Sequence, residues 1–128
     1  MKQYEPSDAE LEILQVLWTD QPASVRQVFD QIKSRRKVSY TTVLTVMQRM
    51  TDKGLVIRTK EGKAHLYQAV PREQEVQKSL SQRLLNTAYK GSALHMALHA
   101  LGQSKITPEE LAELQEWLNN QKVPGDER

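Results

Sequence analysis

Hydrophobic residues recur at helical spacing near the start of the chain and predict two short helices. The first helix is expected from about Asp8 to Thr19, because apolar side chains return every three or four positions. Its apolar positions are Leu11, Ile13, Leu14, Leu17 and Trp18. Ser7 and Glu10 have the spacing of a capping box at its start. After a break at Pro22, a second helix with the same start signal is predicted to end near Lys33.

A third helix is predicted from about Tyr40 to Lys53, with Ser39 as its N-cap and Gly54 after its last turn. The apolar stripe that should face a core consists of Val43, Val46, Met47 and Met50, with Leu44 at its edge. The opposite face carries Thr41, Thr42, Thr45, Gln48 and Arg49. This helix should therefore bury one side and expose a row of short polar groups on the other.

After the third helix, the spacing of hydrophobic residues changes from a period of 3.6 to a period of 2, which predicts a β-hairpin. Residues 55–59 and 65–70 are rich in strand-forming residues, and the turn between them, residues 60–64, contains Gly62. Tyr67 is expected to pack in the core or within the hairpin. Three short helices followed by a hairpin are typical of a winged helix-turn-helix domain.

The remaining residues are entirely helical in pattern. Helices are expected over residues 72–90, from Ser92 to Gly102 and after Thr107, with Trp117 as a core anchor and a frayed tail over residues 123–128. We therefore predict a mainly α protein, with a winged helix-turn-helix domain over residues 1–71 and a helical dimerisation region over residues 72–128. These helices carry more leucine than they can bury among themselves, so a second copy should cover them. The alternative is that they fold back on their own winged helix.

The net charge of +2 hides an uneven distribution. Residues 1–72 carry 12 basic and 8 acidic side chains, whereas residues 73–128 carry 6 and 8. Between Lys33 and Arg72, ten basic residues face two acidic ones. A local basic surface of this kind is typical of proteins that bind nucleic acid.

The helix over residues 40–53 is the expected recognition helix for double-stranded DNA, because an α-helix fits the major groove. Its Thr and Gln side chains offer hydrogen bonds to base edges, and the basic side chains of the helix and the hairpin would neutralise phosphates. The predicted DNA-binding residues are Tyr40, Thr41, Thr42, Thr45, Gln48, Arg49, Arg58, Lys60 and Lys63.

The same residues carry a resemblance to a known family. Residues 10–14 (Glu-Leu-Glu-Ile-Leu), residues 39–45 (Ser-Tyr-Thr-Thr-Val-Leu-Thr) and residues 53–56 (Lys-Gly-Leu-Val) resemble the BlaI/MecI penicillinase-repressor family. The resemblance implies a bacterial, cytoplasmic transcriptional repressor that binds a palindromic operator as a homodimer. It also implies a sensor protease as partner, which causes cleavage at an Asn-Phe bond in the carboxy-terminal region. This chain departs from that pattern, since its one phenylalanine is Phe29 and no such pair stands near His99.

Other functions are less well supported by the residues. His95 and His99 stand at i and i+4, the geometry of a metal-binding pair, but no third ligand is evident, so a metal-responsive regulator is kept as an alternative. A winged helix used only for protein contacts is another. An enzyme is not expected, because the chain lacks cysteine and a Gly-rich phosphate loop. No cofactor, signal peptide or membrane segment is expected either.

Overall fold

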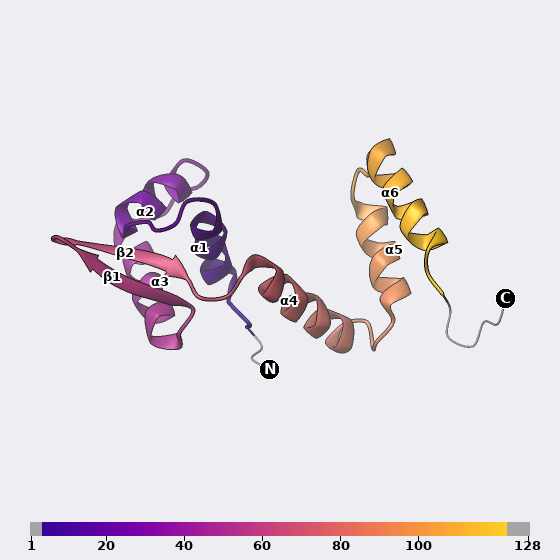
Figure 1. Ribbon diagram of the computed structural model, residues 1–128, viewed down its shortest axis with the longest axis horizontal. Coiled ribbons are helices and arrows are strands. Elements are labelled where there is room, and N and C mark those ends of the chain that lie inside the picture. Colours follow the sequence, from indigo (N-terminus) through magenta and orange to yellow (C-terminus); the bar gives the residue numbers. More distant parts are fainter. Residues whose placement is uncertain (1–3, 123–128) are drawn as a thin grey trace. The chain divides into compact units, whose positions relative to one another are not determined.

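The computed structural model describes residues 4–122 of the 128 in the chain. The elements within this range, in chain order, are α1 (Asp8–Thr19), α2 (Val25–Lys33), α3 (Tyr40–Lys53), β1 (Val56–Glu61), β2 (Ala64–Ala69), α4 (Glu73–Thr87), α5 (Ala93–Gln103) and α6 (Pro108–Asn119) (Figure 1). The predicted fold class, mainly α with one hairpin in a winged-helix order, is confirmed. The tail predicted over residues 123–128 lies outside the described residues.

Local capping signals explain where the first helices begin. Ser7 Oγ accepts from the Glu10 N–H, and the Glu10 side chain accepts from the Ser7 N–H, which completes a capping box at α1. Ser24 and Gln27 do the same at α2. At the other end of α3, Gly54 adopts a left-handed φ of 78°, a conformation that a side chain would strain.

The core lies under α1, α2, α3 and the base of the hairpin. Apolar side chains from all four segments are buried there: Ile13, Leu14, Val16, Leu17, Val28, Phe29, Ile32, Val43, Val46, Met47, Met50, Val56 and Tyr67. The predicted stripe of α3 is thus confirmed. Tyr67 is buried as predicted, whereas Trp18 is half-buried against this core and its Nε1–H donates to the Pro71 carbonyl at 3.0 Å.

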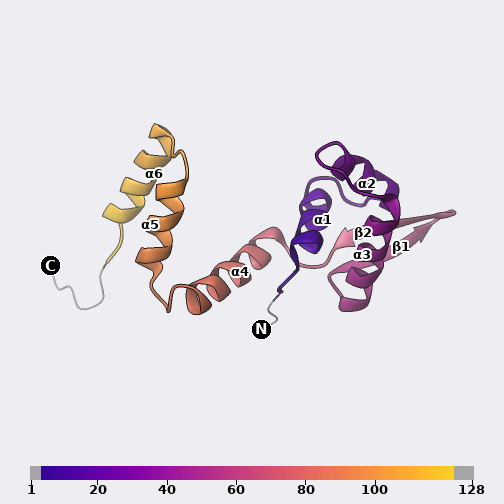
Figure 2. The ribbon, with the colours of Figure 1, turned by 180° about the vertical axis from the view of Figure 1, so that it is seen from behind.

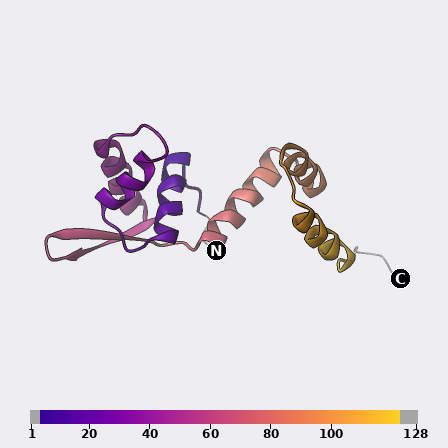
Figure 3. The ribbon, with the colours of Figure 1, turned by 90° about the horizontal axis from the view of Figure 1, so that it is seen from above.

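The hairpin is an antiparallel pair in which Val56 faces Ala69 and Glu61 faces Ala64. β1 extends two residues further than predicted and β2 begins one residue earlier, so the turn is reduced to Gly62 and Lys63 rather than residues 60–64. Continued cross-strand pairing up to Glu61 and Ala64 explains the difference. In all three views the tip of the hairpin projects beyond α1, α2 and α3 (Figures 1, 2 and 3).

Backbone bonds hold the base of the hairpin to the loop before α2. Ala23 and Tyr67 exchange two hydrogen bonds, of 3.1 and 2.8 Å, and the Ala69 N–H donates to Gln21 Oε1 at 2.8 Å. Isolated hairpins are marginally stable, so these hydrogen bonds stabilise the β1–β2 hairpin, which forms the wing of the domain.

Contacts divide the chain into two units, Met1–Leu84 and Leu85–Arg128. The sequence places a boundary between residues 71 and 72 instead. The first part of α4 belongs with the winged helix because Val76 is completely buried in the first core. The Tyr4 N–H also donates to Ser79 Oγ at 3.3 Å, which ties α4 to the residues before α1.

The second unit contains α5 and α6, joined by a short connection over residues 104–107. Neither helix buries a side chain. Trp117, predicted to be a core anchor, is 58% exposed, so that prediction is wrong. Two short amphipathic helices cannot enclose a core by themselves. In the described residues, no helix is long and apolar enough to cross a membrane.

Candidate nucleic-acid interface

The outer face of α3 is exposed along its length. Thr41, Thr45 and Gln48 follow one another at i, i+4 and i+7, and Thr42 and Arg49 lie beside them on the same side. All five side chains are exposed, while the opposite stripe is buried. Because the buried stripe fixes the rotation of the helix about its axis, these polar groups are held outward. This arrangement suits a helix that reads a groove.

The amino-terminal end of α3 is built by Ser39 and Tyr40. Ser39 Oγ accepts from the Thr42 N–H at 3.1 Å and lies 2.8 Å from Thr42 Oγ1. The Tyr40 ring meets the Phe29 ring edge to face, with centroids 5.7 Å apart, and Tyr40 remains 40% exposed. Tyr40 therefore packs on α2 through its ring and still has an accessible surface.

The wing presents its basic residues on a defined face. Arg58 stands opposite Tyr67, and Lys60 stands opposite His65. Cross-strand partners share a face of the sheet, and Tyr67 is buried against the helices. Arg58, Lys60 and His65 thus lie on the helix side of the wing, further towards its tip, and Lys63 lies in the turn. The sequence did not single out His65, because only the strand register places it beside Lys60.

Some basic side chains of α3, the hairpin and the loop before α3 are bonded to other groups of the protein, and others are not. Within residues 4–122, the side chains of Arg49, Arg58, Lys60 and Lys63 make no hydrogen bond or ion pair and are exposed. Such groups are available to an external anion.

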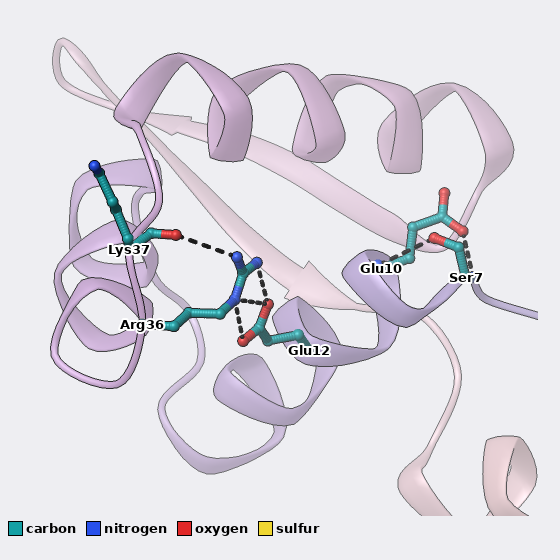
Figure 4. A network of polar contacts seen from close by, with 5 residues as sticks. All are labelled: Ser7, Glu10, Glu12, Arg36 and Lys37. Carbon is teal, nitrogen blue, oxygen red and sulfur yellow. Dashed lines mark hydrogen bonds and ion pairs between the residues drawn. The ribbon is translucent and has the colours of Figure 1, made fainter.

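Arg36, in the basic loop before α3, is held by the protein instead. Its Nη2 lies 2.7 Å from Glu12 Oε1 and its Nε donates to both Glu12 oxygens at 3.1 Å (Figure 4). Its Nη1 also donates to the Lys37 carbonyl at 3.4 Å. The hydrogen bond from Arg36 lowers the pKa of Glu12, and Glu12 in turn raises the pKa of Arg36. This pair fastens the loop to α1.

Lys53, at the end of α3, is similarly engaged. Its Nζ lies 2.8 Å from Oε2 of Glu10, whose side chain is only 1% exposed. Burial raises the pKa of Glu10, but the bonds from Lys53 and Ser7 outweigh it, so this pKa lies below its ordinary value of 4.5. The carboxylate therefore links the start of α1 to the end of α3.

Two further cations lie on α2 and were missed from the sequence. The Arg26 guanidinium and the Lys33 ammonium each lie 5.6 Å from the centroid of the Phe29 ring. Arg26 is also 3.4 Å from Asp30, in an exposed pair. Residues 26, 29 and 33 share one stripe of the helix, and Phe29 contacts Tyr40 at the start of α3. The spacing was visible in the sequence, but the contact with Tyr40 depends on the fold.

The histidine pair considered as a metal site is on α5. His99 Nδ1 lies 3.2 Å from the Tyr89 hydroxyl, and the two rings meet at a centroid distance of 5.5 Å. In the part of the chain that the structure describes, no three His, Cys, Asp or Glu side chains gather as a metal site would require.

Comparisons with known proteins agree on one family. The family described as "Penicillinase repressor" matches residues 6–120. The methicillin resistance regulatory protein MecI of Mammaliicoccus sciuri is 29% identical over 92% of this chain and 96% of its own length. The transcriptional regulator BlaI of Mycobacterium tuberculosis is 35% identical over 71% of this chain and 67% of its own. The solution structure of the DNA-binding domain of the repressor BlaI is 28% identical, with a TM-score of 0.51 over 58% of this chain and 90% of that one.

Proposed function

Since the chain belongs to the penicillinase repressor family, we propose that it is a transcriptional repressor that binds a palindromic DNA operator as a homodimer. The protein-only winged helix is less favoured, because the relatives include a penicillinase repressor and a transcriptional regulator. The metal-responsive alternative is less favoured, because no third ligand joins His95 and His99 in the described residues.

In the proposed complex, α3 enters the major groove and the wing follows the adjacent backbone. Thr41, Thr42, Thr45 and Gln48 meet base edges, since hydroxyl and amide groups bond to them and a Thr methyl packs on a thymine methyl. The cations at positions 49, 58, 60 and 63 neutralise phosphates. Arg26 and Lys33 extend these backbone contacts over α2, the element that crosses the backbone in helix-turn-helix proteins.

One observation carries the proposal. Within the described residues, Arg58 and Lys60 lie without protein partners on the side of the sheet that faces the helices, Lys63 lies in the turn, and α3 exposes a row of polar side chains. Four basic side chains without protein partners in this range can bind phosphates, and the hydroxyl groups near them can bond to base edges. Exposure to solvent alone does not account for this combination.

The homodimer is supported by the apolar surface of the second unit. Leu94 is 66% exposed and Leu98 is 55% exposed on α5, and Leu111 and Leu118 are also exposed on α6. Leu94 and Leu98 lie one helical turn apart, and a group of large apolar side chains left exposed favours an interaction site. A second copy related by a two-fold axis covers it and presents two winged helices to two half-sites.

Relief of repression by proteolytic cleavage, which the family resemblance implies, does not fit this sequence. Cleavage at an Asn-Phe bond would need a phenylalanine in the carboxy-terminal region, and the chain has none there. Induction by cleavage at such a bond is therefore not part of this proposal.

The test of DNA binding is its dependence on salt. The affinity of the purified protein for random duplex DNA should fall by orders of magnitude between about 50 and 200 mM salt. Lys60→Ala and Lys63→Ala should each weaken binding to all sequences and reduce the salt slope by about 1. Lys78→Ala is the matched control, because Lys78 is an exposed cation on α4 outside the proposed surface. Slopes equal to that of the control would contradict the role of the wing.

The test of dimerisation is the molar mass in solution. Leu98→Glu should convert a dimer into a monomer in sedimentation experiments, since a charge would be placed in the apolar interface. Gln103→Glu, an exposed polar position on the same helix, is the control and should leave the dimer intact. A wild-type protein that sediments as a monomer at micromolar concentration would rule out the homodimer.

A further inference from the structure

The start of α3 lacks a feature that three other helices of this chain share. α1, α2 and α6 each have a capping box, in which Glu10, Gln27 or Glu110 returns a hydrogen bond to the N-cap backbone. The residue at the corresponding position of α3 is Thr42, whose side chain is too short to complete the box. Within residues 4–122, the Ser39 N–H has no protein partner. The helix proposed to read DNA thus begins with a weaker cap.

Thr42 makes a different bond in its place. Its Oγ1 lies 2.8 Å from Ser39 Oγ, and its N–H donates to the same Ser39 oxygen at 3.1 Å. Thr19 and Thr51, elsewhere in the chain, donate to the carbonyls of the residues four positions earlier. Thr42 lies in the first turn of α3, where the residue four positions earlier is not helical and its carbonyl is not placed to accept such a bond. The Ser39 hydroxyl is the group that holds Thr42.

This contact removes a choice of rotamer. A threonine in a helix divides between two χ1 rotamers, and the bond to a carbonyl or hydroxyl selects between them. Thr42 is exposed, so packing does not fix it. The Ser39 hydroxyl therefore decides where the Oγ1 and the methyl of Thr42 are presented. Thr41 and Thr45, in the described residues, have no such side-chain partner.

We propose that Ser39 is a positioning residue for sequence recognition, which holds the Thr42 hydroxyl and methyl in one orientation towards a base pair. The inference rests on the proposed function, since it requires that Thr42 meets DNA. A side chain already ordered in the free protein loses less conformational entropy on binding and presents one pattern of donor, acceptor and methyl to the base.

The variant that isolates this role is Ser39→Gly. Glycine is tolerated at an N-cap with only a small loss of stability, so the helix should persist while the hydroxyl is removed. The readout is the ratio of affinities for duplexes that differ at one base pair, after the preferred sequence of the wild-type protein has been selected from random DNA. We expect the preference at the pair read by Thr42 to fall by roughly two- to threefold, because Thr42 then divides between two χ1 rotamers.

A rescue and a matched control separate positioning from capping. Ser39→Thr keeps a hydroxyl at the N-cap and should restore the ratio. Ser92→Gly removes the equivalent cap from α5, where Ser92 Oγ accepts from the His95 N–H at 3.2 Å and no box is present. That variant should leave the ratio unchanged.

The outcomes distinguish this inference from the proposed function. Thr42→Val, which keeps the shape and removes the hydroxyl, should alter the preference at the same base pair. If it does so and Ser39→Gly retains the wild-type ratio, the role of Ser39 is overturned and the proposed function stands. An equal loss of affinity for all duplexes in Ser39→Gly also overturns it, because Ser39 then acts only as a cap. If Thr42→Val leaves the preference unchanged, the assignment of α3 as the reading helix fails as well.

Discussion

Replacing Glu10 by glutamine should weaken the bond between α1 and α3 without disturbing the cap. The Glu10 side chain is 1% exposed, accepts from the Ser7 N–H at 2.9 Å and meets Lys53 Nζ at 2.8 Å. A glutamine can keep the first bond, as Gln27 does at the start of α2. Glu10→Gln therefore removes the charge opposite Lys53 and little else.

The expected magnitude follows from the exposure of the two partners. A hydrogen bond to a charged group contributes about 1.5–3 kcal/mol. Because the Lys53 side chain is 51% exposed and keeps access to water, the loss should lie at the lower end, about 1–2 kcal/mol of the free energy of unfolding. For a unit of this size, each kcal/mol shifts the melting temperature by about 4–8 °C, so a decrease of roughly 5–15 °C is expected.

The dependence on pH provides a second check with a definite sign. The pKa of Glu10 is lowered below 4.5 in the folded protein, so its ion pair stabilises the fold above that pH. This contribution is lost as the pH falls through the folded pKa. The difference in stability between wild type and Glu10→Gln should thus be complete at pH 7 and shrink below pH 4.5.

Urea denaturation followed by tryptophan fluorescence measures this difference. The substitution Trp117→Phe should be present in every variant, so that Trp18 alone reports on the first unit, and protein concentration should be constant. Glu110→Gln is the matched control, because Glu110 completes a capping box and has no cation partner in the described residues. A double-mutant cycle with Lys53→Met isolates the pair.

Two results would refute the reasoning. One is a Glu10→Gln protein that is as stable at pH 7 as the Glu110→Gln control. The other is a stability difference that does not shrink as the pH is lowered below 4.5, because the contribution of the ion pair must fall once the unfolded chain takes up the proton.

Other substitutions test separate parts of the structure. Val76→Ala should destabilise the first unit by about 2 kcal/mol in the same urea assay, because two buried methyl-sized groups are removed at about 0.8 kcal/mol each and a cavity remains. Gly54→Ala should lower stability by about 1–2 kcal/mol through its positive φ alone, since an added Cβ meets no atom within 4 Å, whereas Gly102→Ala, inside α5, should raise helix stability by about 0.5–1 kcal/mol in circular dichroism melts. Arg36→Gln should raise the pKa of Glu12 towards its ordinary value, as measured by NMR titration, and an unchanged pKa would contradict the bond drawn in Figure 4.

Much of the winged helix was predictable because its signals are local. The helix over residues 40–53 was predicted with its observed bounds, since its N-cap, its apolar stripe and Gly54 act over one or two turns of the chain. The nine predicted DNA-binding residues are all exposed on α3 and the wing, although their contact with DNA stays a prediction.

The errors arose where distant parts of the chain meet. The extent of β1 and β2 depends on cross-strand pairing, and the place of α4 depends on Val76 reaching a core built by α1, α2, α3 and the hairpin. Trp117 was expected inside because it is large and apolar, but a helix with too few neighbours leaves such a side chain exposed.

The sequence by itself determined the helices, the capping signals and the sign of the charge on the first half of the chain, because these depend on residues near one another in the chain. Only the tertiary structure decided which cations are occupied: Arg36 by Glu12 and Lys53 by Glu10, each across more than 20 residues of sequence. It also placed Arg26 and Lys33 over Phe29 beside the start of α3. Pairing of charges requires atoms to approach within about 4 Å, a distance that residue type and spacing cannot specify when the chain must fold to bring them together.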